Sequence, residues 1–148
     1  MEAIQLRRVD AAGFQSELDA RRGHPVFVNF WASWCEPCIA EFPELVRAAR
    51  EWRPRGISFV SVSADEATDL GPVEQTLERF GAPFDSVLVA SGDIDALIRQ
   101  VDTDWTGALP ASFLYDPSGA KVRKELGMVT PQMLESWFRG VVTGADRR

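Results

Sequence analysis

A switch of hydrophobic pattern between residues 26 and 52 constrains this chain more than any other feature. Residues 26–32 (VFVNFWA) form an apolar run, which is typical of a strand buried on both faces of a mostly parallel sheet. Within residues 39–52, apolar side chains recur instead at helical spacing. We therefore expect a central buried strand that leads directly into an amphipathic helix.

The only two cysteines of the chain, Cys35 and Cys38, lie at this strand–helix junction. Three residues apart on a first helical turn, they share a face and can form a disulfide or act as a dithiol. The positive end of a helix stabilises a thiolate, so we expect Cys35 to be the nucleophile and Cys38 the resolving cysteine. Pro37 suits a first helical turn, and the charge of Glu36 opposes the thiolate in part.

Other uses of two cysteines fit this sequence less well. A structural zinc site needs about four ligands, and besides the cysteines only His24 is a comparable donor. A purely structural disulfide across two intervening residues would constrain little chain. A Cys–His hydrolase would need His24 beside Cys35, but His24 precedes the strand and Cys35 follows it.

Length and composition predict a single domain, residues 1–148, of an ordinary water-soluble kind. The net charge of −6 argues against binding of nucleic acid, and no apolar run is long enough for a membrane span. We expect a monomer that is cytoplasmic as written, or extracytoplasmic if a signal or anchor was trimmed. Because no glycine-rich dinucleotide loop is present, we expect no cofactor beyond the cysteine pair.

Further strands and helices follow from local patterns and turn residues. A polar loop follows the second buried strand, and a Pro-Ser-Gly turn joins the two strands of a hairpin. The predicted elements are strands at 4–9, 57–62 and 86–89, helices at 11–22 and 71–80, a helix capped by Ser91, a hairpin at 111–126, and a last helix that begins at Thr130-Pro131 and buries Met133, Leu134, Trp137, Phe138, Val141 and Val142.

The segment VNFWASWCEPC, residues 28–38, resembles the active-site strand, loop and helix of the thioredoxin superfamily. Its WCEPC form is most similar to the TlpA-like protein-disulfide reductases, which include ResA-type and CcmG-type proteins. The resemblance implies an α/β thioredoxin-like fold, with a central mixed sheet flanked by helices. Residues 66–91 would then correspond to the helix–strand insertion at the centre of TlpA-like proteins.

The same resemblance predicts which residues hold a substrate. In this family the proline that matches Pro110 is cis and faces the two cysteines, and it exposes the backbone of the preceding residue, here Leu109, for pairing with a substrate peptide. Glu36 and Pro37, between the cysteines, complete this part of the predicted substrate site. The alternative is that Pro110 is only a turn or edge residue.

Three tryptophans have different expected roles. Trp34, just before Cys35, resembles the exposed tryptophan with which the family contacts its substrates. Trp31 is expected to fill core space at the sheet. Trp105 is expected to add apolar area beside Pro110.

The chain lacks the buried aspartate that thioredoxin carries at the position of Asn29, for which we expect a hydrogen-bonded core amide. Glu66 matches the acidic residue that ResA-type proteins place near the cysteines, where a carboxylate can accept the proton of Cys38 and raise the thiol pKa values. Asp65 is the rival for this role. The remaining alternative is an exposed loop acid without a catalytic part.

These features predict a thiol–disulfide oxidoreductase that reduces protein disulfides at Cys35 and Cys38 and is itself restored by a separate reductant protein. Acids near the cysteines destabilise the thiolate, which favours a reducing couple. One alternative is a redox-silent module that binds extended peptides beside Pro110. Another is a thiol peroxidase, but the P-x-x-x-T-x-x-C pattern of peroxiredoxins is absent, since residues 28–35 contain neither proline nor threonine.

Overall fold

The computed structural model describes residues 6–66, 68–90 and 92–143. Within these residues, six strands form one sheet in the order β1-β4-β3-β2-β5-β6. The first four in this order are parallel, β5 is antiparallel to β2, and β6 is antiparallel to β5. The predicted mixed sheet is therefore confirmed. The strands are β1 (Arg8–Val9), β2 (Val26–Trp31), β3 (Ser58–Ser63), β4 (Asp85–Val89), β5 (Ala111–Tyr115) and β6 (Lys121–Glu125).

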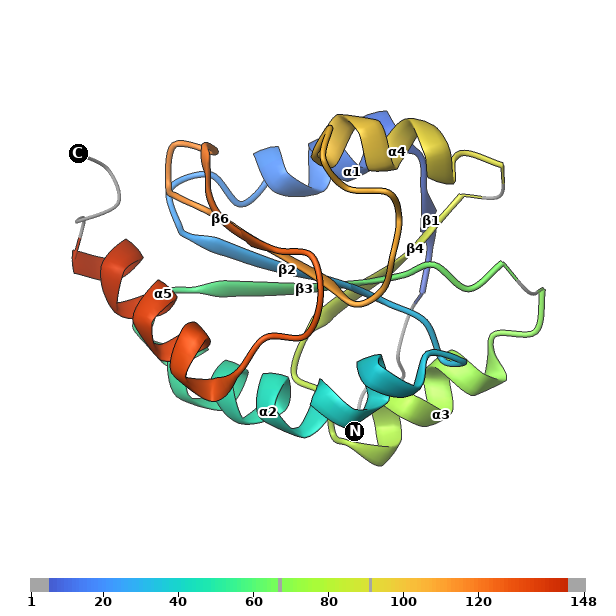
Figure 1. The fold of residues 1–148 in the computed structure, drawn as a ribbon, viewed down its shortest axis with the longest axis horizontal. Helices are drawn as coiled ribbons and strands as arrows, with labels where there is room; N and C mark the ends of the chain where they lie inside the picture. Colours follow the sequence, from blue (N-terminus) through green and yellow to red (C-terminus); the bar gives the residue numbers. More distant parts are fainter. Residues whose placement is uncertain (1–5, 67, 91, 144–148) are drawn as a thin grey trace.

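Helices cover both faces of the sheet, as Figure 1 shows. On one face lie α1 and α4, and on the other lie α2, α3 and α5. The fold is thus the thioredoxin-like three-layer arrangement that the cysteine motif predicts. None of the described helices has the length and apolar character needed to cross a membrane. The helices are α1 (Ala11–Asp19), α2 (Glu36–Trp52), α3 (Gly71–Arg79), α4 (Ile94–Val101) and α5 (Pro131–Thr143), with a short 3-10 turn at Arg53–Arg55.

The helix–strand pair α3–β4 occupies the segment expected to be an insertion. Strand β4 pairs with β3 on one side and with β1 on the other, in parallel on both. It therefore widens the sheet between β1 and β3 and leaves β2 in contact with β3 and β5.

The central strand β2 sends alternate side chains to opposite faces of the sheet. Val28 and Phe30 pack with residues of α1 and α4, whereas Phe27 packs against Phe138 of α5, with ring centroids 5.5 Å apart. All six residues of β2 are buried, as the apolar run predicts. The same alternation turns Asn29 toward the α2 side, where it meets a polar group of that helix.

Some predicted boundaries are wrong at the ends of elements. Helix α1 ends at Asp19 rather than residue 22, because the backbone N–H groups of Arg21 and Arg22 bond to oxygens only three residues back and form a turn. In α5 the predicted apolar stripe is largely buried, but Val142 is 39% exposed. It follows the fully buried Val141 and is turned by about 100° around the helix axis, at the edge of the buried stripe.

Two predictions fall partly outside the described residues. Residues 4 and 5 of the predicted strand at 4–9 are not covered, and neither is Ser91. Of the rest of that strand, only Arg8–Val9 is extended as β1, so its predicted start is wrong for Leu6 and Arg7. Asp93 precedes α4, and its side chain makes no bond to that helix. Its carboxylate instead accepts a hydrogen bond of 2.7 Å from the backbone N–H of Ala11, and so ties α4 to the start of α1.

Candidate active site

The two cysteines form a disulfide at the N-terminus of α2, with Cα atoms 5.3 Å apart. Cys35 is the residue before the helix, and its sulfur accepts a hydrogen bond of 3.3 Å from the backbone N–H of Cys38. The sulfur of Cys35 therefore caps the helix, where backbone N–H groups favour negative charge. Cys35 is 6% exposed and Cys38 only 1%, so Cys35 is the sulfur that a partner can reach.

A buried carboxylate holds the turn that leads into Cys35. Asp65 accepts hydrogen bonds from the backbone N–H of Ser33 at 2.9 Å and from the hydroxyl of the same serine. It also accepts one from the Ser63 hydroxyl at 2.6 Å. Asp65 thus links the end of β3 to the turn after β2, and its oxygens are engaged in holding that turn.

The tryptophans on either side of this turn differ in burial. Trp31 is fully buried, and its Nε1 donates to the Ser61 hydroxyl at 2.8 Å, which confirms the expected core position. Trp34 is 70% exposed and stands beside Cys35. Glu36 and Pro37, on the first turn of α2, are exposed as well, so three of the predicted substrate-binding side chains are accessible.

The peptide bond between Leu109 and Pro110 is cis, as predicted. Strand β5 begins at Ala111, which pairs with Phe30 near the end of β2. This register places Leu109 and Pro110 beside the turn that carries the cysteines. Leu109 packs against the apolar cluster that includes Cys35 and Cys38, so the structure brings these predicted site residues together.

The buried acid nearest in sequence to the cysteines is Glu41, which sequence reasoning missed. It lies on α2 three residues after Cys38, hence on the same helix face, and is 2% exposed. Its carboxylate accepts hydrogen bonds from the Asn29 side chain at 3.1 Å and the Val129 backbone N–H at 2.9 Å. Burial raises the pKa of Glu41 to about 7, although these two hydrogen bonds lower it in part.

Asn29 joins this carboxylate to the strand that follows the cis peptide. Its amide donates to Glu41 and also, at 3.0 Å, to the Ser112 hydroxyl of β5. The predicted hydrogen-bonded core amide is thereby confirmed. A polar chain of Ser112, Asn29 and Glu41 therefore runs through the core between β5 and α2.

The signal for Glu41 was present in the sequence. A glutamate at residue 41 falls on the buried side of α2, between Cys38 and Phe42, and faces a strand that carries one polar residue, Asn29, in an apolar run. A charged residue on an apolar helical stripe is buried at a cost unless it is bonded. Searching for the polar partner of Asn29 would have found it.

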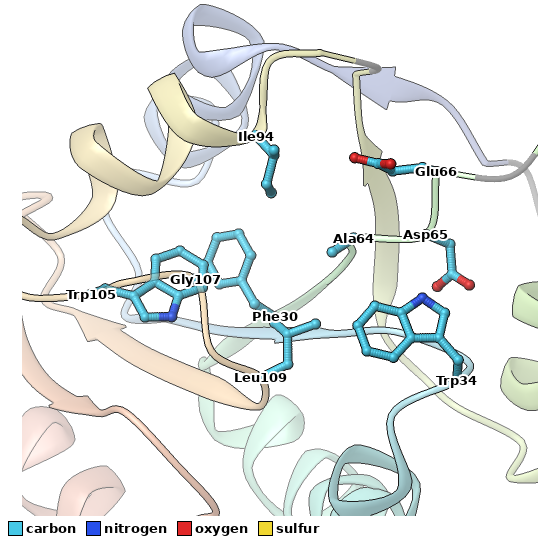
Figure 2. A pocket seen from close by; sticks show the side chains of 9 residues that line it. All are labelled: Phe30, Trp34, Ala64, Asp65, Glu66, Ile94, Trp105, Gly107 and Leu109. Atoms are coloured by element: carbon cyan, nitrogen blue, oxygen red, sulfur yellow. The ribbon is translucent and has the colours of Figure 1, made fainter.

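Glu66, the acid predicted to serve the cysteines, is exposed at the end of the β3 loop. It borders a cavity of about 460 Å³ together with Trp34, Trp105 and Leu109, which Figure 2 shows from close by. Neither cysteine is among the residues that line this cavity. The structure therefore groups Glu66 with the predicted substrate contacts.

Together, this fold and the disulfide between Cys38 and the slightly more exposed Cys35 define a thiol–disulfide oxidoreductase of the thioredoxin-like class. Residues 2–124 match the AhpC/TSA family, so the chain belongs to that family. The thiol–disulfide oxidoreductase ResA of Bacillus thuringiensis (strain Al Hakam) is 31% identical over 140 residues, which cover 95% of this chain and 76% of that protein. ResA of Bacillus subtilis (strain 168) is 32% identical over 136 residues, covering 91% and 71%.

A solved structure gives the same answer for the fold. The crystal structure of a thiol:disulfide interchange protein of the thioredoxin family from Chlorobium tepidum TLS superposes with a TM-score of 0.70, at 26% identity over 90% of each chain. The predicted resemblance to TlpA-like, ResA-type reductases is confirmed, and the protein is an oxidoreductase that acts on disulfides.

Replacing Glu41 by glutamine should remove a pH dependence of stability. A carboxyl with a pKa of about 7 when folded and 4.5 when unfolded binds more protons in the native state between these values. The free energy of unfolding therefore falls as pH rises through this range, by about 3 kcal/mol in all. Glu41→Gln has no such group, so its stability relative to the wild type should rise from pH 4 to pH 8.

Urea denaturation of the oxidised protein at these two pH values measures this change. Glutamine has one hydrogen-bond acceptor oxygen fewer than glutamate. The stability lost for this reason is the same at both pH values, so it cancels when the two pH values are compared. Glu51→Gln, an exposed change on the same helix, serves as the matched control. Equal pH slopes for the wild type and Glu41→Gln would show that Glu41 is not held in this way.

Proposed function

We propose that the protein reduces disulfides in protein substrates in two exchange steps. The Cys35 thiolate attacks one substrate sulfur, a mixed disulfide forms, and the other substrate sulfur leaves as a thiolate. Cys38 then attacks the Cys35 sulfur, the second substrate thiolate leaves, and a Cys35–Cys38 disulfide remains. Two electrons pass from the enzyme to the substrate, so a separate reductant protein must restore the dithiol.

The position of the two sulfurs is the observation that carries this proposal. Cys35 has the helix N-terminus behind it and the small exposed area that attack requires, whereas Cys38 lies buried one turn inside. A buried second thiol meets the mixed disulfide only from within the protein. This geometry suits resolution by Cys38 and protects it from reaction with other thiols.

We assign to Glu41 the proton that Cys38 must lose before it attacks. The Glu41 carboxyl has a pKa of about 7, so at neutral pH it is ionised in part and can accept a proton. It lies one helical turn beyond Cys38 on the same face, and Asn29 and Val129 hold its two oxygens. The exposed Glu66 lacks such fixed positioning among the residues that the structure describes.

We place the substrate beside Trp34 and the Leu109–Pro110 peptide. The exposed indole supplies apolar contact area next to Cys35, and the residue before a cis proline can pair its backbone with an extended peptide. Glu36 and Pro37 lie exposed on the first turn of α2, between the two cysteines. Stable protein disulfides occur chiefly outside the cytoplasm, which supports an extracytoplasmic site of action.

Cysteine variants separate reduction from mere peptide binding. With dithiothreitol as the reductant, the wild type should catalyse insulin reduction, and Cys35→Ser should show only the uncatalysed rate because the attacking sulfur is gone. Cys38→Ser should accumulate a mixed disulfide with insulin chains, visible on a non-reducing gel. If the wild type reduces insulin no faster than Cys35→Ser does, the result would favour the redox-silent binding module. Rapid peroxide consumption by the wild type would favour the peroxidase.

Two glutamine variants distinguish the candidate proton acceptors. The reduced protein reacts with an aromatic disulfide reagent whose released thiolate absorbs visible light, and the second equivalent released reports attack by Cys38. In the wild type this rate should rise with pH through about 7, the pKa of Glu41. Glu41→Gln should lose this rise and slow the step by roughly a hundredfold, the low end of what general bases contribute.

Glu66→Gln should keep the rise near pH 7, because Glu41 is intact. The reverse pattern, with the rise lost in Glu66→Gln and kept in Glu41→Gln, would return the role to Glu66.

A further inference from the structure

The cavity beside the cysteine turn has no part in the exchange steps. It encloses about 460 Å³, enough for one large side chain of a bound peptide. Phe30 and Trp105 form its aromatic floor, with ring centroids 4.7 Å apart. Figure 2 shows Ile94, Leu109 and the exposed Trp34 around the opening.

The walls of this cavity are held in place by contacts of the loop before Pro110. Trp105 is buried, and its Nε1 donates to the Ala108 carbonyl at 2.9 Å. Gly107 has a φ of 96°, and a Cβ at this position would lie 2.7 Å from Cδ1 of Ile98 on α4. The positive φ favours glycine here, and the loop lies against Ile98 of α4.

The charged residues that line the cavity are all acidic. Of its nine lining residues, Asp65 and Glu66 are acidic, and none is basic. Asp65 is occupied by its bonds to Ser33 and Ser63. The Glu66 carboxylate has no hydrogen-bond or ion-pair partner within residues 6–66, 68–90 and 92–143, and in Figure 2 it points toward the space beside Ile94.

The guanidinium of Arg8 lies near Asp65 and binds backbone groups there. Arg8 donates from Nη1 to the carbonyl of Asp65 at 3.1 Å and to that of Val89 at 2.9 Å. It is not among the residues that line the cavity. The exposed indole of Trp34 and the Glu66 carboxylate at the opening therefore face a ligand together, above the buried rings of Phe30 and Trp105.

We propose that this cavity binds an arginine side chain of the substrate, next to the cysteine that Cys35 attacks. The inference rests on the proposed function and specifies its substrate class. A guanidinium stacks on aromatic rings and pairs with a carboxylate, here Glu66, while its apolar stem covers the ring edges. Trp34 and Leu109 line both the cavity and the predicted peptide site, so the arginine lies within about two residues of the attacked cysteine, a spacing set by the rise of an extended strand.

Peptides that differ in one charge test this assignment. Each peptide is closed by one disulfide and carries arginine at one of the four positions nearest a cysteine. A matched control peptide carries citrulline at the same position, which has nearly the same shape without the charge. At one position at least, kcat/KM for reduction should favour arginine about three- to tenfold, the range expected for a partly exposed ion pair on an aromatic surface. The preference should shrink in 0.5 M salt.

Protein variants then locate the preference. In Glu66→Gln the ratio of the arginine rate to the citrulline rate should fall to about one, even if both rates change. Glu78→Gln removes the same charge from an exposed site on α3 away from the cavity and should keep the ratio. Equal rates for arginine and citrulline at every position, or a preference that survives in Glu66→Gln, would overturn the inference while leaving disulfide reduction intact.

If the protein reduces neither insulin nor any peptide of the set, both the proposed function and the substrate assignment are refuted. The two failures are therefore distinguishable in one series of measurements.

Discussion

The turn between β2 and α2 is the constraint on which the site depends. It must end a buried strand and begin a helix within four residues, and it must leave Cys35 where the first helical N–H groups point. Asp65 provides the anchor through its bonds to Ser33 and Ser63. If this turn moved, Cys35 would lose the field of the helix, and Trp34 would leave the cavity that it borders.

Two opposing electrostatic effects act on the sulfurs at this turn. The helix N-terminus stabilises a thiolate on Cys35, whereas the carboxylates of Glu36 and Glu41 disfavour nearby negative charge. The charge of Glu41, when ionised, acts more strongly than that of Glu36, since Glu41 is buried where solvent cannot screen it. The reduced enzyme is thereby less stable relative to the disulfide than the helix alone would make it, which suits a protein that donates electrons.

Local signals in the sequence were sufficient for most of the fold and for the sulfurs. The apolar run at β2, the helical stripe of α2 and the turn before β6 all lie within short windows, and the motif resemblance supplied the cis bond at Pro110. Glu41 was missed because its partners, Asn29 and Val129, are distant in sequence. The acid was sought in the β3 loop instead, where Asp65 holds a turn and Glu66 faces solvent.

The reduction potential of the Cys35–Cys38 pair tests most directly whether acids around the sulfurs make this protein a reductant. It is measured by equilibrating the protein with glutathione buffers of known potential and counting free thiols by alkylation. We expect a value at or below about −220 mV, toward that of thioredoxin near −270 mV. A value near −120 mV, like that of the strong oxidant DsbA, would contradict this explanation.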